Sequence, residues 1–241
     1  MATSCSHVLI WVRDIHRAVR DYRALGFKVE YAVPEKKALH AHIWFTEGPI
    51  IELLSFPFGA KWFKWPIEFL AGRGSGRRMV GWAEKGEGFC DVAVVIDGAD
   101  FKRELAAFRR AGVPVGRAIP WRRTNIHGQR LRYQYAYPKN RRLPILLTPY
   151  DPPQHPKHNE HPNGSTRMSR VRMGVRDEDR EALHRIIGDD PTFALDTAET
   201  TAVRSVELTG LTHELDAALL HGAVVQPAGS VSEPVQCSTV N

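Results

Sequence analysis

The sequence contains few cysteines, and none of its three stands in a metal-binding or redox spacing. An odd number of scattered cysteines argues against a disulfide scaffold, so a reducing cytoplasm is the expected compartment. No apolar run approaches the roughly 18 to 20 residues that a membrane helix needs. The first residues lack a basic region followed by an apolar one, so no secretory signal is expected.

Signatures of nucleic-acid recognition are also missing, since no helix-turn-helix, zinc-finger or single-strand-binding pattern occurs. The formal net charge is +6. Such a charge attracts anionic small molecules or, weakly, nucleic acid, while the plainer interpretation is a solvated, arginine-rich surface. With 43% hydrophobic residues, the chain can bury a core. We expect a small-molecule ligand, no specific nucleic acid and no membrane.

The stretch 7–14 has the pattern of a β-strand, on which two sets of side chains point to opposite faces. Asp14 then stands where a helix N-cap belongs, and Gly26 is placed to end that helix. Strand patterns follow at 27–33, 39–46 and 50–56. Residues 5–58 therefore predict a β-α-β-β-β module.

The same order of elements recurs at 89–150, so we expect two modules in one domain at 5–150. The insertion at 59–87 carries an aromatic cluster around Trp62, which is either a cover over a cleft or ordinary core. A glycine- and arginine-rich stretch at 72–78 follows the cluster. This stretch lacks the lysine of a phosphate-binding loop, which favours a mobile surface loop over an anion site.

Four prolines at 151–164 exclude regular structure there, and we expect a solvated linker. Its three histidines recur every third residue, but proline forbids the helix that could make them a metal site. A third, partial β-α-β-β module is expected at 165–225. Residues 226–241 have the composition of a disordered tail.

These motifs resemble the glyoxalase I, bleomycin-resistance and extradiol-dioxygenase superfamily, which has the vicinal oxygen chelate fold. The resemblance covers roughly residues 5–210 and points to the glyoxalase-like domain branch. It implies an α+β fold in which paired modules pack edge to edge around a cleft, here with a third partial module. The matching segments are His7–Asp14, Leu25–Phe27, Ile51–Leu53, Leu143–Leu146 and His161–Gly164.

In this family, metal-dependent members place one ligand on the first strand and one on the fourth strand of each module. The resemblance assigns these places to His7 and Glu52 in the first module, and to Asp91 and Leu146 in the second. Leucine cannot bind a metal, so a four-residue site is incomplete. His7, Glu52 and Asp91 remain as ligands for a divalent ion such as Zn²⁺, Ni²⁺, Fe²⁺ or Mn²⁺. No nucleotide cofactor is indicated.

Strand alternation adds further cleft residues. His42 shares a face with His40 and Trp44, and it could replace the missing ligand or act as a base near neutral pH. The alternative is that one of the two histidines is exposed and the other is hydrogen-bonded within the sheet. The substrate-binding residues predicted on similar grounds are Trp11, Trp44, Trp62, Arg132 and Tyr133.

Two functions follow from the sequence. The first is an enzyme with metal-assisted isomerase or lyase-type chemistry on a small oxygenated molecule, with Glu52 or His42 moving a proton. The second is a non-catalytic protein that binds or sequesters a small molecule in the same cleft. The incomplete second half-site favours the second function, whereas His7, Glu52 and Asp91 favour the first. The sequence leaves a homodimer open.

Overall fold

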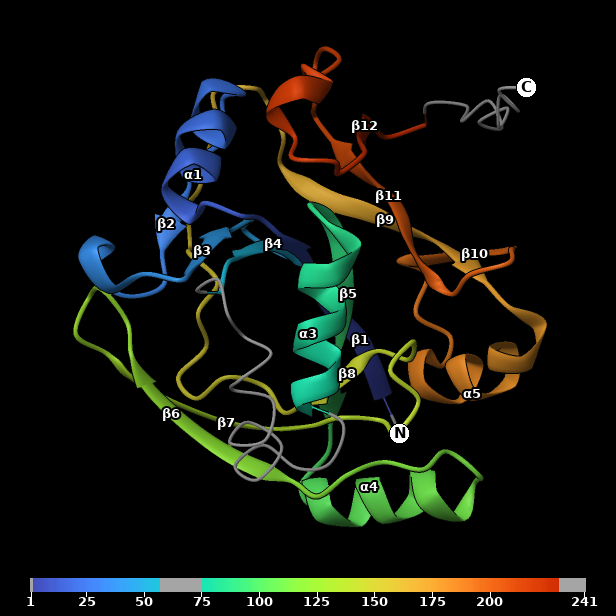
Figure 1. Ribbon diagram of the computed structural model, residues 1–241. Coiled ribbons are helices and arrows are strands. Elements are labelled where there is room, and N and C mark those ends of the chain that lie inside the picture. The colour runs from blue at the N-terminus through green and yellow to red at the C-terminus, as the bar shows by residue number, and fades with distance from the viewer. Residues whose placement is uncertain (1, 57–74, 230–241) are drawn as a thin grey trace.

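Two β-α-β-β-β modules share one eight-stranded sheet in the computed structural model, which describes residues 2–56 and 75–229. The sheet has the order β2-β3-β4-β1-β5-β8-β7-β6 (Figure 1). The first module consists of β1 (Ala2–Trp11), α1 (Ile15–Ala24), β2 (Glu30–Tyr31), the short 3₁₀ helix η1 (Glu35–Lys37), β3 (His40–Ile43) and β4 (Ile50–Leu54). The second consists of β5 (Gly88–Asp97), α4 (Phe101–Arg110), β6 (Ile119–Thr124), β7 (Arg130–Ala136) and β8 (Ile145–Leu147).

The modules meet where β1 and β5 pair antiparallel, with Ala2 opposite Asp97 and Trp11 opposite Gly88. The paired modules and the mixed fold class confirm the architecture expected from the sequence. The repeat implies a strand between α4 and β7, but the basic residues of β6 lack a strand's alternation, so its position was not predicted.

Alternation along β1 separates the core from the other face of the sheet, as predicted. Val8, Ile10 and Val12 are fully buried in the main core, which also contains the apolar residues of α1. His7 and Leu9 point to the opposite face. Asp14 caps α1 by accepting hydrogen bonds from the backbone N–H groups of its first turn.

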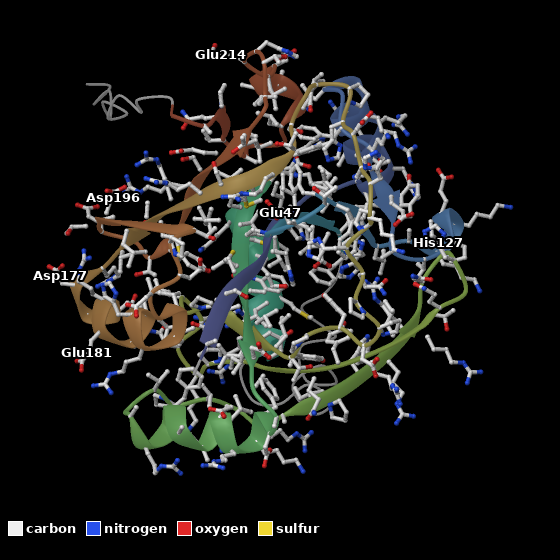
Figure 2. All side chains as sticks on the ribbon, turned by 180° about the vertical axis from the view of Figure 1, so that it is seen from behind. Glu47, His127, Asp177, Glu181, Asp196 and Glu214 are labelled. Atoms are coloured by element: carbon white, nitrogen blue, oxygen red, sulfur yellow. The ribbon has the colours of Figure 1, made fainter. Side chains whose placement is uncertain are left out.

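The two ends of the sheet curve toward each other. The turn between β6 and β7 reaches the first module beside η1 (Figure 1), and Figure 2 shows His127 at that end of the hairpin. There His127 Nε2 lies 2.7 Å from Oε1 of Glu30 on β2. Arg123 Nη1 also lies 3.5 Å from the carbonyl oxygen of Ala32. These contacts bring the edges of the two modules together around a cavity.

Helix α3 (Ser75–Lys85) lies along β5 in the connection between the modules (Figure 1). The prediction of a mobile loop at 72–78 is therefore wrong for residues 75–78, which are helical. Met79 and Trp82 pack against Leu9 and Trp11 on the cavity side of the sheet. The aromatic cluster around Trp62 lies outside the described residues.

A third module forms its own four-stranded sheet in the order β10-β9-β11-β12. A buried carboxylate, Asp179 on α5, links it to the second module: it accepts hydrogen bonds from Asn140, Arg142 and Thr201. The elements are β9 (Arg167–Val175), α5 (Asp177–Ile187), β10 (Phe193–Thr197), β11 (Ala202–Thr209), the 3₁₀ helix η2 (Ala217–Leu219) and β12 (Val225–Pro227). β12 includes residues that the sequence assigned to a disordered tail.

The proline-rich segment at 151–164 is irregular, but its end is not the solvated linker that the sequence predicts. His161 is buried, with Nδ1 accepting from the backbone N–H of Lys28. Asn163 donates to the carbonyl of Leu25 and accepts from Ser165. Gly26 has φ of +81° and lies against Asn163, so a side chain there would collide with it. The His-Pro-Asn-Gly motif thus fixes the turn after α1.

No helix in the described part of the chain is long and apolar enough to cross a membrane.

Asp179 makes the docking of the third module pH-dependent. Burial alone would raise its pKa, but the hydrogen bonds from Arg142, Thr201 and Asn140 hold the pKa to about 2. Because this value lies below that of a free aspartate, the contribution to stability is present above about pH 4 and is lost as the pH falls toward 2. We expect Asp179→Asn to lower the free energy of unfolding at pH 7 by about 1.5–3 kcal/mol.

Urea unfolding at a series of pH values checks this, with Asp177→Asn as the control. Asp177 lies in the same turn, at the outer edge of α5 (Figure 2), and its side chain is 85% exposed. Equal effects of the two substitutions, or a loss from Asp179→Asn that does not shrink below pH 4, would contradict this role.

Candidate active site

A buried glutamate surrounded by three histidines forms the polar end of the cavity. Glu52 lies on β4, opposite His42 of β3 and Leu9 of β1. Its Oε2 is 3.2 Å from His7 Nε2, and its Oε1 is 2.6 Å from His40 Nδ1 and 3.9 Å from His42 Nε2. The sequence predicted that His7 and Glu52 would share the cavity and left open whether both His40 and His42 would join them; the structure brings all four together.

The charges at this end follow from burial and hydrogen bonding. Burial alone would raise the pKa of Glu52, but the hydrogen bond from His40 and the nearby histidines lower it below the ordinary value. Glu52 is therefore ionised at neutral pH. Burial lowers the pKa of His7, and it lowers that of His42 to about 3. His42 is thus neutral, which corrects the expectation of a base that titrates near pH 7.

The cavity has a volume of about 400 Å³, within the range of small-molecule sites. Away from Glu52 its walls are mostly aliphatic and aromatic, with Lys37 and Arg123 as the charged exceptions, and they come from both modules and from α3. A ligand with one oxygen-bearing end and one flat, apolar body would match this division. The apolar part is lined by Leu9, Leu54, Phe56, Met79, Trp82, Trp121, Tyr133, Tyr135, Tyr137, Ile145, Leu147 and Tyr150.

Of the predicted substrate-binding residues, Tyr133 lines the cavity. Trp11 is buried in the packing behind it, with Nε1 unpartnered among the described residues. Trp44 lies beyond the end of β3, where its ring contacts His155. Arg132 is 66% exposed and pairs with Asp151, because it points to the face of β7 opposite Tyr133. Trp62 lies outside the described residues.

Asp91 does not join His7 and Glu52. Both of its oxygens accept from Arg78, at 2.5 Å to Nε and 2.8 Å to Nη2, and Trp82 Nε1 donates to one of them at 3.1 Å. The side chains of Arg78 and Asp91 are 2% and 5% exposed. The third-ligand role predicted for Asp91 is therefore replaced by a buried ion pair that anchors α3 to β5.

The second half of the site is apolar. The sequence placed Leu146 opposite Glu52, but Leu146 belongs to the main core, and its neighbours Ile145 and Leu147 face the cavity. The alignment was off by one residue, which on a strand exchanges the faces. Either assignment leaves no metal ligand at this position.

A divalent ion fits the donors around Glu52 by their chemistry. Two imidazoles that burial keeps neutral and one ionised carboxylate form a set that binds Mn²⁺, Fe²⁺ or Zn²⁺. Across residues 2–56 and 75–229, however, no three His, Cys, Asp or Glu side chains are already gathered as a group that could hold a metal ion. The fit thus rests on the chemistry of the donors, of which His7 Nε2 is 3.2 Å and His42 Nε2 is 3.9 Å from Glu52.

Arg123 is a cavity residue that the sequence analysis missed. It lies on β6, two positions after Trp121, and both side chains line the cavity. Alternation would have placed the two on one face if 119–124 had been recognised as a strand. Tyr150 lines the cavity as well and was also missed.

The model of the glyoxalase-like domain family matches residues 5–187. A hypothetical protein from Staphylococcus aureus has a similar structure, with a TM-score of 0.66 and 12% identity over 93% of this chain and 99% of that one. The Mn(II)-bound glyoxalase from Novosphingobium aromaticivorans gives a TM-score of 0.52 and 11% identity over 87% and 66%. At these identities the two structures establish the fold alone. No curated protein sequence matches the chain.

The role of Asp91 as the partner of Arg78 in a buried ion pair can be tested by its effect on stability. Removing one partner of a buried pair leaves an uncompensated charge, so we expect Asp91→Asn to lower the free energy of unfolding by about 3–5 kcal/mol. Urea unfolding measures the loss, and Asp97→Asn, exposed at the end of the same strand, is the control. A loss from Asp91→Asn no larger than the control's would show that the pair does not stabilise the fold.

Proposed function

Because the chain belongs to the glyoxalase-like domain family of the vicinal oxygen chelate superfamily, we propose that it is an enzyme acting on a small oxygenated organic molecule. The substrate binds in the cavity between the modules, and the reaction is metal-assisted isomerase or lyase-type chemistry. The observation that carries this proposal is the buried, ionised Glu52 with three histidines around it at one end of a cavity whose other walls are mostly apolar.

His7, His42 and Glu52 are the residues that would hold a divalent metal. When bound, the metal supplies a positive charge that polarises a carbonyl or enolate oxygen of the substrate. Burial of both histidines keeps their nitrogen lone pairs unprotonated at neutral pH, so no proton competes for them. The apolar walls exclude water and hold the body of the substrate.

Glu52 and His40 are suited to move a proton. Glu52 Oε2 faces His7, while Oε1 is 2.6 Å from Nδ1 of His40, whose side chain is 40% exposed. A proton taken from the substrate at Oε1 therefore has a short route through His40 to solvent. Of the two roles predicted for Glu52, proton transfer thus belongs to Oε1 and metal binding to Oε2. His42 is a metal ligand rather than a base.

A second candidate function is non-catalytic binding of a small molecule in the same cavity. The aliphatic character of the second half-site favours it, because Ile145 and Leu147 can only pack against a ligand. This function needs no metal, so metal binding distinguishes the two.

We expect chelator-stripped protein to bind one equivalent of Mn²⁺, Ni²⁺ or Zn²⁺ in isothermal titration calorimetry. Removing a ligand removes a bond to the ion, so His7→Ala, His42→Ala and Glu52→Gln should each weaken binding at least about tenfold. Elemental analysis of protein purified without chelator identifies the natural ion.

His184→Ala and Glu181→Gln are the controls, since both residues are exposed on α5, far along the chain from the cavity strands. They should bind metal as the parent does. A parent that binds none of the three ions more tightly than about 0.1 mM, or cavity variants that match the controls, would remove the metal-assisted reaction and leave the binding function.

A further inference from the structure

A positive charge faces the cavity from the second module. The side chain of Arg123 extends from β6 and is partly buried. Its charge acts on both His7 and His42, since it adds to the effect of burial in lowering their pKa values. Arg123 lines the same cavity as His7, His42 and Glu52, although it comes from the other module.

Arg123 lacks the partner that a buried guanidinium usually has. Nε is buried and makes no hydrogen bond, and the contact of Nη1 with the carbonyl of Ala32 is long at 3.5 Å. No carboxylate of the described segments lies within ion-pair distance of it. By contrast, Arg78 pairs with Asp91 and Arg132 with Asp151.

The nearest carboxylate at the polar end is already occupied. Both oxygens of Glu52 face histidines, through Oε1 to His40 and Oε2 to His7. The negative charge that would complement Arg123 is thus absent from the described walls. A ligand that carries its own carboxylate would supply it through charge-assisted hydrogen bonds.

Aromatic rings surround this charge. Tyr133 and Tyr150 pack edge to face with centroids 4.8 Å apart, and Arg123 is near enough to influence the pKa of each. Tyr135 continues the row, with its ring 6.3 Å from that of Trp121. Such rings contact the face or edge of a flat ligand and favour an aromatic body over a flexible one.

We propose that Arg123 binds the carboxylate of the substrate and that the substrate is an aromatic or similarly flat organic acid. This inference rests on the proposed function and names its substrate class. We take a carboxylate as the anionic group, because its two oxygens match the paired N–H groups of one guanidinium.

The test compares acids with their neutral amides in chelator-treated protein, so that no metal contributes. Ligand-observed NMR titrations use phenylacetate and 3-phenylpropionate, each paired with its amide, together with phenyl phosphate. We expect each acid to bind at least about tenfold more tightly than its amide. In Arg123→Gln this preference should fall to near one, while affinity for the amides stays the same.

Arg122→Gln is the matched control, since Arg122 neighbours Arg123 on β6 and is exposed on the opposite face. It should keep the full preference for acids. Arg123→Lys keeps the charge but not the two parallel N–H groups of a guanidinium, so it should retain part of the preference for acids over amides. This variant tests the proposal if Arg123→Gln does not fold.

The proposal is overturned if the parent binds acids and amides equally or binds none of them below about 10 mM. It is also overturned if Arg123→Gln keeps the preference or if phenyl phosphate binds more tightly than both acids. Metal binding without a preference for acids would reject this inference alone. A preference for acids without metal binding would reject only the metal-assisted reaction.

Discussion

The antiparallel pairing of β1 with β5 is the contact on which the site depends. It joins two modules, each with an exposed strand edge, into a single sheet, and an unpaired edge of this length would leave a row of backbone groups without partners. Because sheets twist in one direction, eight strands in a row curve until their ends approach. The contacts of His127 with Glu30 and of Arg123 with Ala32 then hold those ends together.

The two halves of the resulting cavity have diverged in chemistry although they repeat in structure. The first module contributes Glu52 and the histidines beside several aliphatic side chains, and the second contributes aliphatic and aromatic side chains with one arginine. An ionised carboxylate is stable in such a place only when polar groups compensate for its lost hydration. At Glu52 these are the hydrogen bond from His40 and the His7 ring 3.2 Å away. The asymmetry orients a ligand, since only one end of it can meet the polar groups.

The sequence predicted the parts of the site that strict alternation controls. The family resemblance placed His7 and Glu52 on two strands of the first module. The alternation along β3 put His40 and His42 on one face but left open whether both enter the cavity, and the structure brings all four side chains together. The predictions for Asp91 and Leu146 were wrong for different reasons. The partner of Asp91, Arg78, lies on a helix that glycines concealed, and Leu146 was misplaced by a one-residue slip that periodicity cannot detect within a uniformly apolar strand. Arg123 was missed because a run of charged residues hid a strand.

The buried motif at the end of the proline-rich segment bears on how this chain can be divided. Composition places a domain boundary at 151–164, yet His161 and Asn163 complete the first module by binding the backbone on both sides of Gly26. The module that begins the chain is thus finished by residues that come after the second module. A fragment that stops near residue 150 would expose the end of α1 and leave the carbonyl of Leu25 without its donor. The first module is therefore longer than its repeat pattern suggests, because a segment more than a hundred residues downstream closes it.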